Sequence, residues 1–286
     1  MTFVQRRPVT FFLVAAVAIT YLAGPVAYFA LRALQGLAGT ALPGVNDLVM
    51  KFGPSLAGLL TVALAEGGRG VKDLLRRCVR WRAPVYLYLF ALLVPALVVL
   101  AVLLARGDGA EVRDVGLQAA LRAFGVQLLL AVLLGGGLAE EVGWRGFMLP
   151  QLCRRSSPLA ATLFVSIAWF SWHVPAYVFL NKGAADPILP FAVIVFPLSI
   201  VLTWAYLRSG GSVLLPILLH GSLNASFYTL VELLPRVAGA TDFQPGFDWT
   251  VAACWTVLAA IVLAASGLRL GANSRGNTSD RSATGA

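Results

Sequence analysis

The sequence predicts an all-α protein, a polytopic membrane helix bundle of about eight transmembrane helices. Three observations favour this fold class. Hydrophobic residues make up 59% of the 286 residues and charged residues only 12%, and the mean hydropathy of +0.81 is well above that of soluble domains. The apolar residues gather in segments of about 20, the length that a helix needs to cross a bilayer. The basic residues collect in alternate loops between these segments.

Eight segments are candidate spans. Gly and Pro interrupt the second and the seventh. The first follows Arg6 and Arg7 as a signal peptide would, but its apolar run from Val9 to Leu31 exceeds the usual core of about 7–15 residues, so we expect a retained helix. In chain order the segments are Val9–Leu34, Val45–Ala65, Pro84–Ala105, Leu117–Leu138, Pro158–Leu180, Ile188–Leu207, Val213–Leu234 and Thr250–Leu268.

The charge pattern predicts that both termini are cytoplasmic. With the N-terminus inside, fifteen of the 22 Lys and Arg residues fall in inner segments and seven in outer ones, as the positive-inside rule requires. Membrane topology thus explains the net charge of +9 without a nucleic-acid partner. The segment Glu66–Arg82 is expected to be a loop that lies against the anionic leaflet, because it holds six of the basic residues.

The chain is predicted to form a single membrane-embedded domain over residues 1–270. The polar segment 271–286 is rich in Ser, Thr and Gly and is expected to be a disordered tail. Cys78, Cys153 and Cys254 are scattered and odd in number, which disfavours both disulfides and a cysteine metal site.

Two adjacent carboxylates end the fourth apolar segment. If the helix continues through residues 135–146, Glu141 and Arg145 lie one turn apart in the favourable order for an ion pair. Glu140 is rotated away from Arg145 and has no local cation, so it is free to face a cavity and to act as a general base or acid. A salt bridge at a membrane-interface helix end would explain Glu141 and Arg145, but it explains Glu140 poorly.

The two histidines of the chain lie in separate apolar segments. His173 follows Trp169 by one helical turn, and Asn224 follows His220 by one turn. Each histidine alone could be a polar contact between helices. Together with Glu140 they predict a reaction centre, because ionisable groups are costly in a bilayer. Glu140 and His173 could activate water, while neutral imidazole and carboxamide N–H groups could stabilise an oxyanion.

These motifs resemble the CPBP family of intramembrane proteases, which includes the type II CAAX prenyl endopeptidases and bacterial abortive-infection or bacteriocin-processing proteins. The matching residues read Glu140-Glu141-x-x-x-Arg145, Trp169-x-x-x-His173 and His220-x-x-x-Asn224. The similarity extends upstream to Phe52–Ala57 and so covers a motif core of residues 45–230. Trp169 departs from the family pattern, which usually has Phe there.

The resemblance implies hydrolysis of a peptide bond in a membrane-associated protein or peptide, by a multi-pass protein of the cell membrane, here a bacterial inner membrane. By that resemblance Glu140 and His173 activate water, and His220 and Asn224 stabilise the oxyanion. Glu141 and Arg145 orient the site, and Trp169 shapes its pocket.

Other functions and a metal-dependent site remain open at this point. A proton-coupled transporter also buries Glu and His, although no inverted repeat is visible. A membrane scaffold, or an immunity or bacteriocin-related binding protein, is a further alternative. Glu140, His173 and His220 could be zinc ligands, but neither histidine has an evident acidic partner for its second ring nitrogen. We therefore favour a site without a metal or another cofactor.

Overall fold

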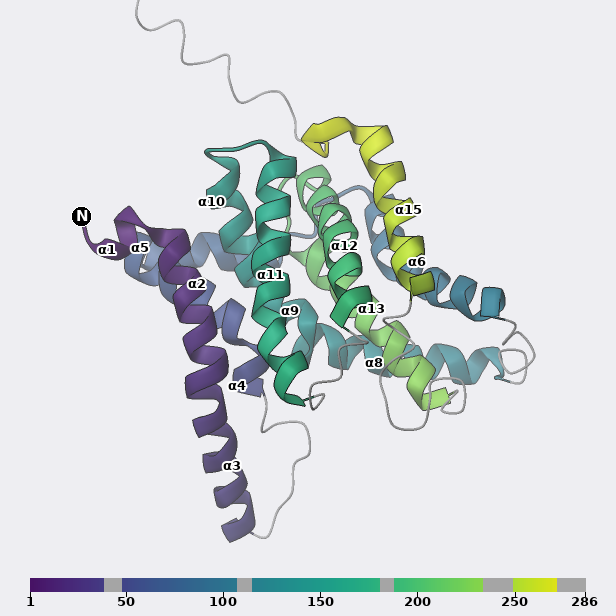
Figure 1. The fold of residues 1–286 in the computed structure, drawn as a ribbon, viewed down its shortest axis with the longest axis horizontal. Helices are drawn as coiled ribbons and strands as arrows, with labels where there is room; N and C mark the ends of the chain where they lie inside the picture. The colour runs from purple at the N-terminus through teal and green to yellow at the C-terminus, as the bar shows by residue number, and fades with distance from the viewer. Residues whose placement is uncertain (39–47, 107–114, 181–187, 234–248, 272–286) are drawn as a thin grey trace, which may run out of the picture.

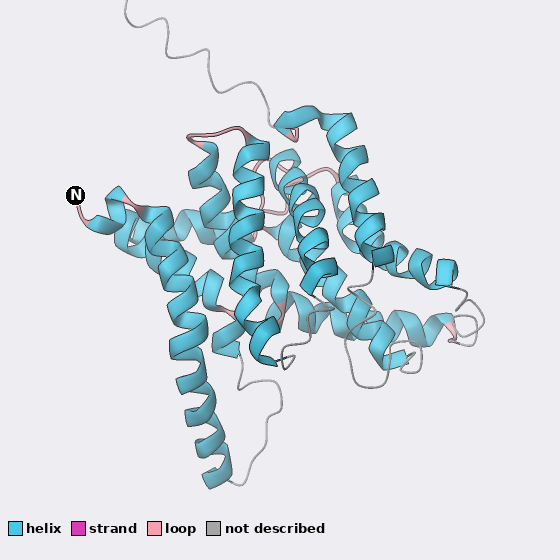
Figure 2. Ribbon diagram, in the orientation of Figure 1, coloured by secondary structure: helices cyan, strands magenta, loops and turns pink. Residues whose placement is uncertain are grey.

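The computed structural model describes residues 1–38, 48–106, 115–180, 188–233 and 249–271, and all regular structure within them is helical (Figure 2). This confirms the predicted all-α class. Figure 1 shows the arrangement of the helices, which are α1 Phe3–Arg6, α2 Pro8–Ala18, η1 Ile19–Ala23, α3 Gly24–Ala38, α4 Leu48–Lys51, α5 Gly53–Cys78, α6 Val85–Arg106, α8 Leu117–Leu134, α9 Gly136–Glu141, η2 Val142–Met148, α10 Leu149–Cys153, α11 Pro158–Leu180, α12 Ile188–Arg208, α13 Leu214–Leu233, α15 Trp249–Ser266 and η4 Gly267–Arg269.

Seven helical segments of the described residues are long and apolar enough to cross a membrane. Large apolar side chains cover their outer faces. Leu22, Val26 and Phe29, for example, are 69–70% exposed, as expected of surfaces that contact lipid rather than water. The protein is therefore a multi-pass integral membrane protein. The seven segments are Pro8–Gln35, Val85–Ala105, Leu117–Cys153, Pro158–Val178, Ile188–Arg208, Leu214–Leu233 and Trp249–Arg269.

The expected span Val45–Ala65 is not among these seven segments. Residues 39–47 lie outside the described part of the chain, and Phe52 separates the short helix α4 from α5. Helix α5 then continues well past Ala65, with one kink at Gly67, whose φ of +67° favours glycine. The polar and basic composition of the part after the kink explains why α5 is not an apolar span.

The segment Glu66–Arg82 is also not the loop that the sequence suggested, because it is helical as far as Cys78. After the kink at Gly67, Leu74 and Cys78 point inward, whereas Lys72 and Arg76 are exposed. This two-sided pattern is typical of a helix at a membrane interface.

Helix α13 occupies the middle of the bundle and packs against α6, α8, α9 and α12 (Figure 1). Close approach depends on glycine at its contact with α8. A Cβ atom on Gly221 would lie 2.4 Å from Cγ2 of Val132 and 3.1 Å from its Cα. Small residues permit this kind of contact between membrane helices.

The fourth span is interrupted where the sequence predicted one continuous helix. Gly135 is extended (φ −102°, ψ −156°), so α8 ends at Leu134 and a new helix, α9, starts at Gly136. A π-helical segment, η2, follows directly after Glu141. The interruption places the two adjacent carboxylates on a short helix of their own.

All three cysteines are free thiols, as predicted. Burial raises the pKa of the Cys78 thiol to about 11, although Arg77 opposes this shift, so Cys78 is unreactive at neutral pH. The proposed tail 271–286 lies outside the described residues except for Gly271, and the cytoplasmic position of both termini stays a prediction.

Candidate active site

A cavity of about 120 Å³ lies between α9, α11, α12, α13 and α15. All four residues that the sequence predicted to be catalytic line it, namely Glu140, His173, His220 and Asn224. The other lining residues are Trp169 and apolar or aromatic side chains of α11, α12, α13 and α15. The predicted residues therefore converge from three separate helices on one mostly apolar cavity.

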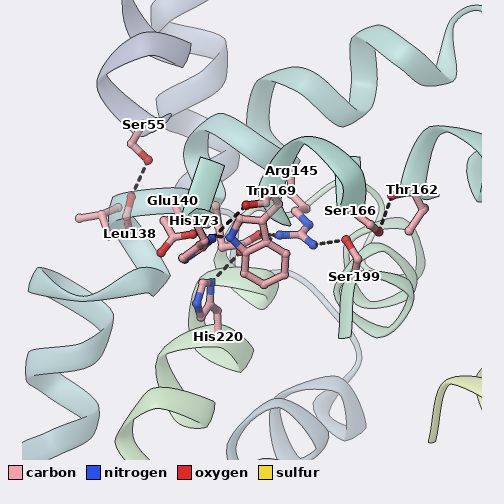
Figure 3. Close-up of polar contacts among 11 residues, drawn as sticks. Ser55, Leu138, Glu140, Arg145, Thr162, Ser166, Trp169, His173, Ser199 and His220 are labelled. Atoms are coloured by element: carbon pink, nitrogen blue, oxygen red, sulfur yellow. Dashed lines mark hydrogen bonds and ion pairs between the residues drawn. The ribbon is translucent and has the colours of Figure 1, made fainter. Parts of the chain in front are cut away.

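Glu140 is 8% exposed, and its carboxylate accepts a hydrogen bond from an indole N–H (Figure 3). The donor is Nε1 of Trp169 on α11, 2.6 Å from Oε2 of Glu140. This hydrogen bond joins α9 to α11 and holds one carboxylate oxygen of Glu140. Carboxylates that accept from N–H donors in apolar surroundings form strong, short hydrogen bonds.

His173 lies on α11, and its Nδ1 is 2.9 Å from the backbone carbonyl oxygen of Trp169. A carbonyl oxygen can only accept, so Nδ1 carries the proton in this hydrogen bond. In the neutral ring Nε2 then holds a lone pair. The rings of Trp172 and Phe191 pack edge-on against the imidazole, with centroids 4.6 Å and 4.9 Å away, and fix its orientation.

His220 is buried on α13, and its Nδ1 lies 2.8 Å from Oε1 of Glu141 on α9. When Glu141 is ionised, Nδ1 donates to it. A neutral ring then has an acceptor at Nε2, and only the imidazolium can also donate from Nε2. The sequence suggested that a neutral His220 donates to an oxyanion. While its Nδ1 donates to an ionised Glu141, however, a neutral His220 has no second N–H group to donate.

Glu141 and Arg145 form the predicted ion pair, but it is buried rather than at an interface. Nη1 of Arg145 donates to Oε1 and Oε2 of Glu141 at 2.8 Å and 3.0 Å, and both side chains are 0% exposed. Nη2 of Arg145 donates to Oγ of Ser199 on α12 at 2.7 Å, and the guanidinium lies 4.8 Å from the Trp169 ring centroid. Glu141 thus links Arg145 to His220.

Asn224 and His220 present nitrogen atoms to the same point beside Gly136. A Cβ atom on Gly136 would lie 2.3 Å from Nε2 of His220 and 2.8 Å from Nδ2 of Asn224. The two nitrogens therefore face one small space that only a glycine leaves open. Such convergent nitrogen atoms could bind an anionic oxygen.

The N-terminal helices brace the site from outside. Nε1 of Trp172, the neighbour of His173, donates to Oγ1 of Thr20 at 3.0 Å, and the Tyr21 hydroxyl donates to the Trp172 carbonyl oxygen. On the other side, Oγ of Ser55 donates to the carbonyl oxygen of Leu138 at 2.8 Å (Figure 3). These contacts tie α11 to η1 and α9 to α5.

Two comparisons show which known proteins this chain resembles. The model of the family "Type II CAAX prenyl endopeptidase Rce1-like" matches residues 122–226, which include every predicted site residue. A CAAX prenyl protease 2 of Methanococcus maripaludis is 28% identical over 172 residues, covering 57% of this chain and 61% of that protein.

Over residues 122–226 the chain is similar to the Rce1-like family.

This confirms the resemblance that the three motifs indicated. The chain spans less than two thirds of the length of the curated relative that it matches. The Rce1-like match begins after the N-terminal helices, so it leaves out Thr20, Tyr21 and Ser55.

The sequence did not indicate several residues of the candidate site, namely Thr20, Tyr21, Ser55, Gly136 and Ser199. Thr20 and Ser199 are buried residues with hydroxyl groups. Their position within apolar runs of the sequence is the feature that could have identified them. Ser55 lay inside the segment Phe52–Ala57, whose similarity was noted without a role for the serine. Gly136 lies in the segment 135–146, where the sequence predicted a continuous helix and gave this glycine no role in the site.

The argument that the histidines lack acidic partners was wrong for His220, whose Nδ1 lies against Glu141, whereas the partner of His173 is a backbone carbonyl oxygen. Metal-binding histidines usually have such partners. Among the described residues, however, no three His, Cys, Asp or Glu side chains are grouped closely enough to hold a metal ion. As placed here, Glu140, His173 and His220 do not form a three-ligand zinc centre.

Proposed function

We propose that this protein is an intramembrane endopeptidase that hydrolyses a peptide bond of a membrane-associated protein or peptide. The convergence of Glu140, His173, His220 and Asn224 on one apolar cavity carries the proposal. Both histidines engage Nδ1 with a neighbour and leave Nε2 for other partners. Groups with fixed orientation that surround a shared space are what a hydrolytic site requires.

Glu140 is the general base of the proposed reaction, with His173 as its partner. Trp169 holds Oε2 of Glu140, so a water molecule can donate to Oε1 and to Nε2 of His173. Glu140 accepts one proton as the water oxygen attacks the carbonyl carbon of the substrate. The same proton then passes from Glu140 to the leaving nitrogen as the C–N bond breaks. The products are a carboxylic acid and an amine.

His220 and Asn224 stabilise the negative charge that develops on the carbonyl oxygen. The Nδ2 group of Asn224 donates, and an imidazolium at His220 donates from Nε2 while Nδ1 donates to Glu141. In that state two cations, Arg145 and His220, balance two anions, Glu140 and Glu141. Preorganised donors of this kind in a site that excludes water lower the barrier to acyl transfer.

Glu141 and Arg145 act as positioning residues. Arg145 holds Glu141 through both carboxylate oxygens, and Ser199 holds Arg145. Glu141 in turn fixes the ring of His220. We expect their substitution to disturb the angle of His220 rather than to remove a reacting group.

The cavity suits an apolar stretch of substrate. Aromatic and aliphatic side chains form most of its wall, among them Phe191, Leu198, Phe227 and Trp255. Because the curated relative is named a CAAX prenyl protease, C-terminal CAAX-type processing is the form of the reaction that we propose to test first.

We further propose that no metal is obligatory. The described His, Cys, Asp and Glu side chains do not group as a metal-binding set, and Glu140 with His173 supplies the proton transfers. Purified active protein should contain well under one equivalent of metal and keep its activity after prolonged chelation. Stoichiometric zinc, with activity lost on its removal and restored on its return, would refute the metal-free reaction.

A cleavage assay in isotopically labelled water tests the hydrolysis directly. Purified protein is incubated in H₂¹⁸O with a mixture of CAAX peptides, prenylated and unprenylated, and the products are analysed by mass spectrometry. Hydrolysis places one ¹⁸O atom in the new carboxyl terminus of the N-terminal fragment and none in the fragment that carries the new amino terminus. Cleavage without the label, or intact peptides in every mixture, would count against the proposed function.

A further inference from the structure

A second, larger cavity of about 660 Å³ lies away from the active site, where the junction of α5 and α6 meets the turn between α12 and α13. Arg76, Arg80 and Arg82 line it, together with Val79, Trp81 and the turn residues Ser209 and Gly210. None of these residues lines the active-site cavity. Three arginine side chains around one space make this cavity strongly basic.

The positive charge of this cavity is not balanced within the described part of the chain. No described carboxylate pairs with Arg76, Arg80 or Arg82, and Asp73 of the same helix pairs with Arg77 at 3.2 Å instead. Uncompensated arginines that share a cavity repel one another unless an anion lies between them. Planar guanidinium groups bind phosphate oxygens through paired N–H donors.

The walls of the basic cavity are held by hydrogen bonds between the two junctions. Nη1 of Arg80 donates to the carbonyl oxygen of Gly210 at 2.6 Å, and Oγ of Ser212 donates to the carbonyl oxygen of Arg80 at 2.6 Å. The Val213 N–H donates to the carbonyl oxygen of Arg77 at 2.9 Å. The cavity is thus a built part of the fold rather than a chance gap between loops.

An apolar groove of about 550 Å³ adjoins the basic cavity and shares Arg76 and Val79 with it. Ala63, Val71 and Leu75 of α5 form its apolar wall. The side chains between the two spaces are also unusually open, since Val79 is 70% and Trp81 is 68% exposed. Basic side chains beside an exposed Trp and an apolar groove are typical of the boundary between headgroups and acyl chains.

We propose that the two adjoining spaces form a binding site for one anionic phospholipid. The phosphate lies in the basic cavity among Arg76, Arg80 and Arg82, and an acyl chain follows the groove along α5. A free phosphate ion would satisfy the arginines but would leave the groove unused. A zwitterionic lipid would fill the groove but would bring a cation toward the arginines. Only an anionic lipid matches both spaces.

The test compares lipid binding by charge-matched variants of the full chain in detergent, measured by native mass spectrometry with phosphatidylglycerol. Arg76→Gln with Arg82→Gln removes two exposed cavity arginines and spares Arg80, which holds the fold. Arg154→Gln with Arg155→Gln removes the same charge from exposed arginines at the α10–α11 turn, outside both spaces. A third variant, Ala63→Phe, fills the groove without changing any charge.

We expect the cavity double variant to bind phosphatidylglycerol at least about tenfold more weakly, since each basic group near a headgroup contributes on the order of 1 kcal/mol. The control double variant should change binding less than about twofold. Ala63→Phe should weaken lipid binding as well, and phosphatidylcholine with the same chains should bind wild-type protein more weakly.

Equal losses in the two double variants would mean diffuse charge attraction and would overturn the site. Equal binding of phosphatidylcholine and phosphatidylglycerol would also overturn it. If inorganic phosphate competes fully and Ala63→Phe has no effect, the cavity binds phosphate itself and the lipid assignment is wrong.

Discussion

At the residue scale, Trp169 contacts four ionisable residues of the active site. Its N–H donates to Glu140, its carbonyl oxygen accepts from His173, and its ring faces the guanidinium of Arg145. The ring also packs edge-on against His220, with centroids 5.4 Å apart. A phenylalanine at this position could supply the ring contacts but not the hydrogen bond to Glu140.

Replacing Trp169 by Phe tests that hydrogen bond. The variant keeps an aromatic ring and loses only the donor to Glu140, so we expect kcat to fall about tenfold or more while KM changes little. A hydrogen bond to a charged group is worth about 1.5–3 kcal/mol. Steady-state cleavage kinetics measure both constants.

Trp144→Phe is the matched control, because the buried Nε1 of Trp144 has no hydrogen-bond partner among the described residues. It makes the same chemical change without the loss of a hydrogen bond. Equal kinetic effects in the two variants would show that Trp169 acts only through packing.

Contacts within one helix could be predicted from the sequence, whereas contacts between helices could not. Spacing by four residues correctly paired Glu141 with Arg145. The same spacing could not predict contacts between helices, because those distances depend on how separate helices pack. Three such contacts are Trp169–Glu140, Arg145–Ser199 and Glu141–His220. The protonated nitrogen of each histidine follows from those same contacts and so was equally out of reach.

At the element scale, interrupted helices position the site. The break at Gly135 starts α9 just before Glu140, and the π-helical segment η2 begins just after Glu141. A second π-helical segment, η1, carries Thr20 and Tyr21. Short π-helical segments are frequent at functional sites because they widen the helix and redirect its side chains.

Gly136→Ala tests the close approach of α9 to α13. The added methyl group would fall 2.3 Å from Nε2 of His220, so it would displace His220 and Asn224 or block the space between them. We expect at least a hundredfold loss of activity, on the order of what an oxyanion donor contributes. A peptide-cleavage assay on folded, detergent-purified protein measures it.

Gly125→Ala on α8 serves as the control, because a Cβ atom there would meet no atom within 4 Å. This variant should keep full activity. Full activity in Gly136→Ala would show that the space between His220 and Asn224 is not used in the reaction.

Hydropathy located seven of the eight expected spans, because each is a long apolar run; six agree to within a few residues at both ends, whereas the segment from Leu117 continues to Cys153 rather than ending at Leu138. The eighth, Val45–Ala65, is not among the seven, since residues 45–47 lie outside the described part of the chain and α5 continues from its apolar stretch into a basic helix across the kink at Gly67. Glycine-rich stretches showed where a helix could break or approach another. They did not show that Gly67 and Gly135, among the many glycines, take non-helical conformations, because packing decides that.

At the scale of the whole molecule, basic residues gather at the ends of several helices. Arg154, Arg208 and Arg269 lie at the ends of α10, α12 and η4, which reach the upper edge in Figure 1. The junctions of α5–α6 and α12–α13, with the basic cavity between them, are joined by hydrogen bonds. Arg145 was counted among the fifteen basic residues of the inner segments. Because it is buried in the active site, its charge does not bear on the membrane topology.

Reporter fusions test the predicted topology. A reporter that works only in the cytoplasm should be active when it is fused after Ala286, because positively charged loops stay inside. A reporter that works only outside the cytoplasm should be active when it is fused after Gly116, between α6 and α8. The opposite pattern at either point would refute the proposed orientation.

The central claim is that Glu140 activates the water molecule that cleaves the substrate. The most direct measurement is the rate of peptide cleavage by purified Glu140→Gln, beside wild type and Glu141→Gln, with folding checked by gel filtration and thermal unfolding. Removal of a general base lowers rates by about 10²–10⁴-fold. We predict folded Glu140→Gln with turnover reduced at least about a hundredfold and a smaller loss in Glu141→Gln. Wild-type turnover by Glu140→Gln would contradict the account.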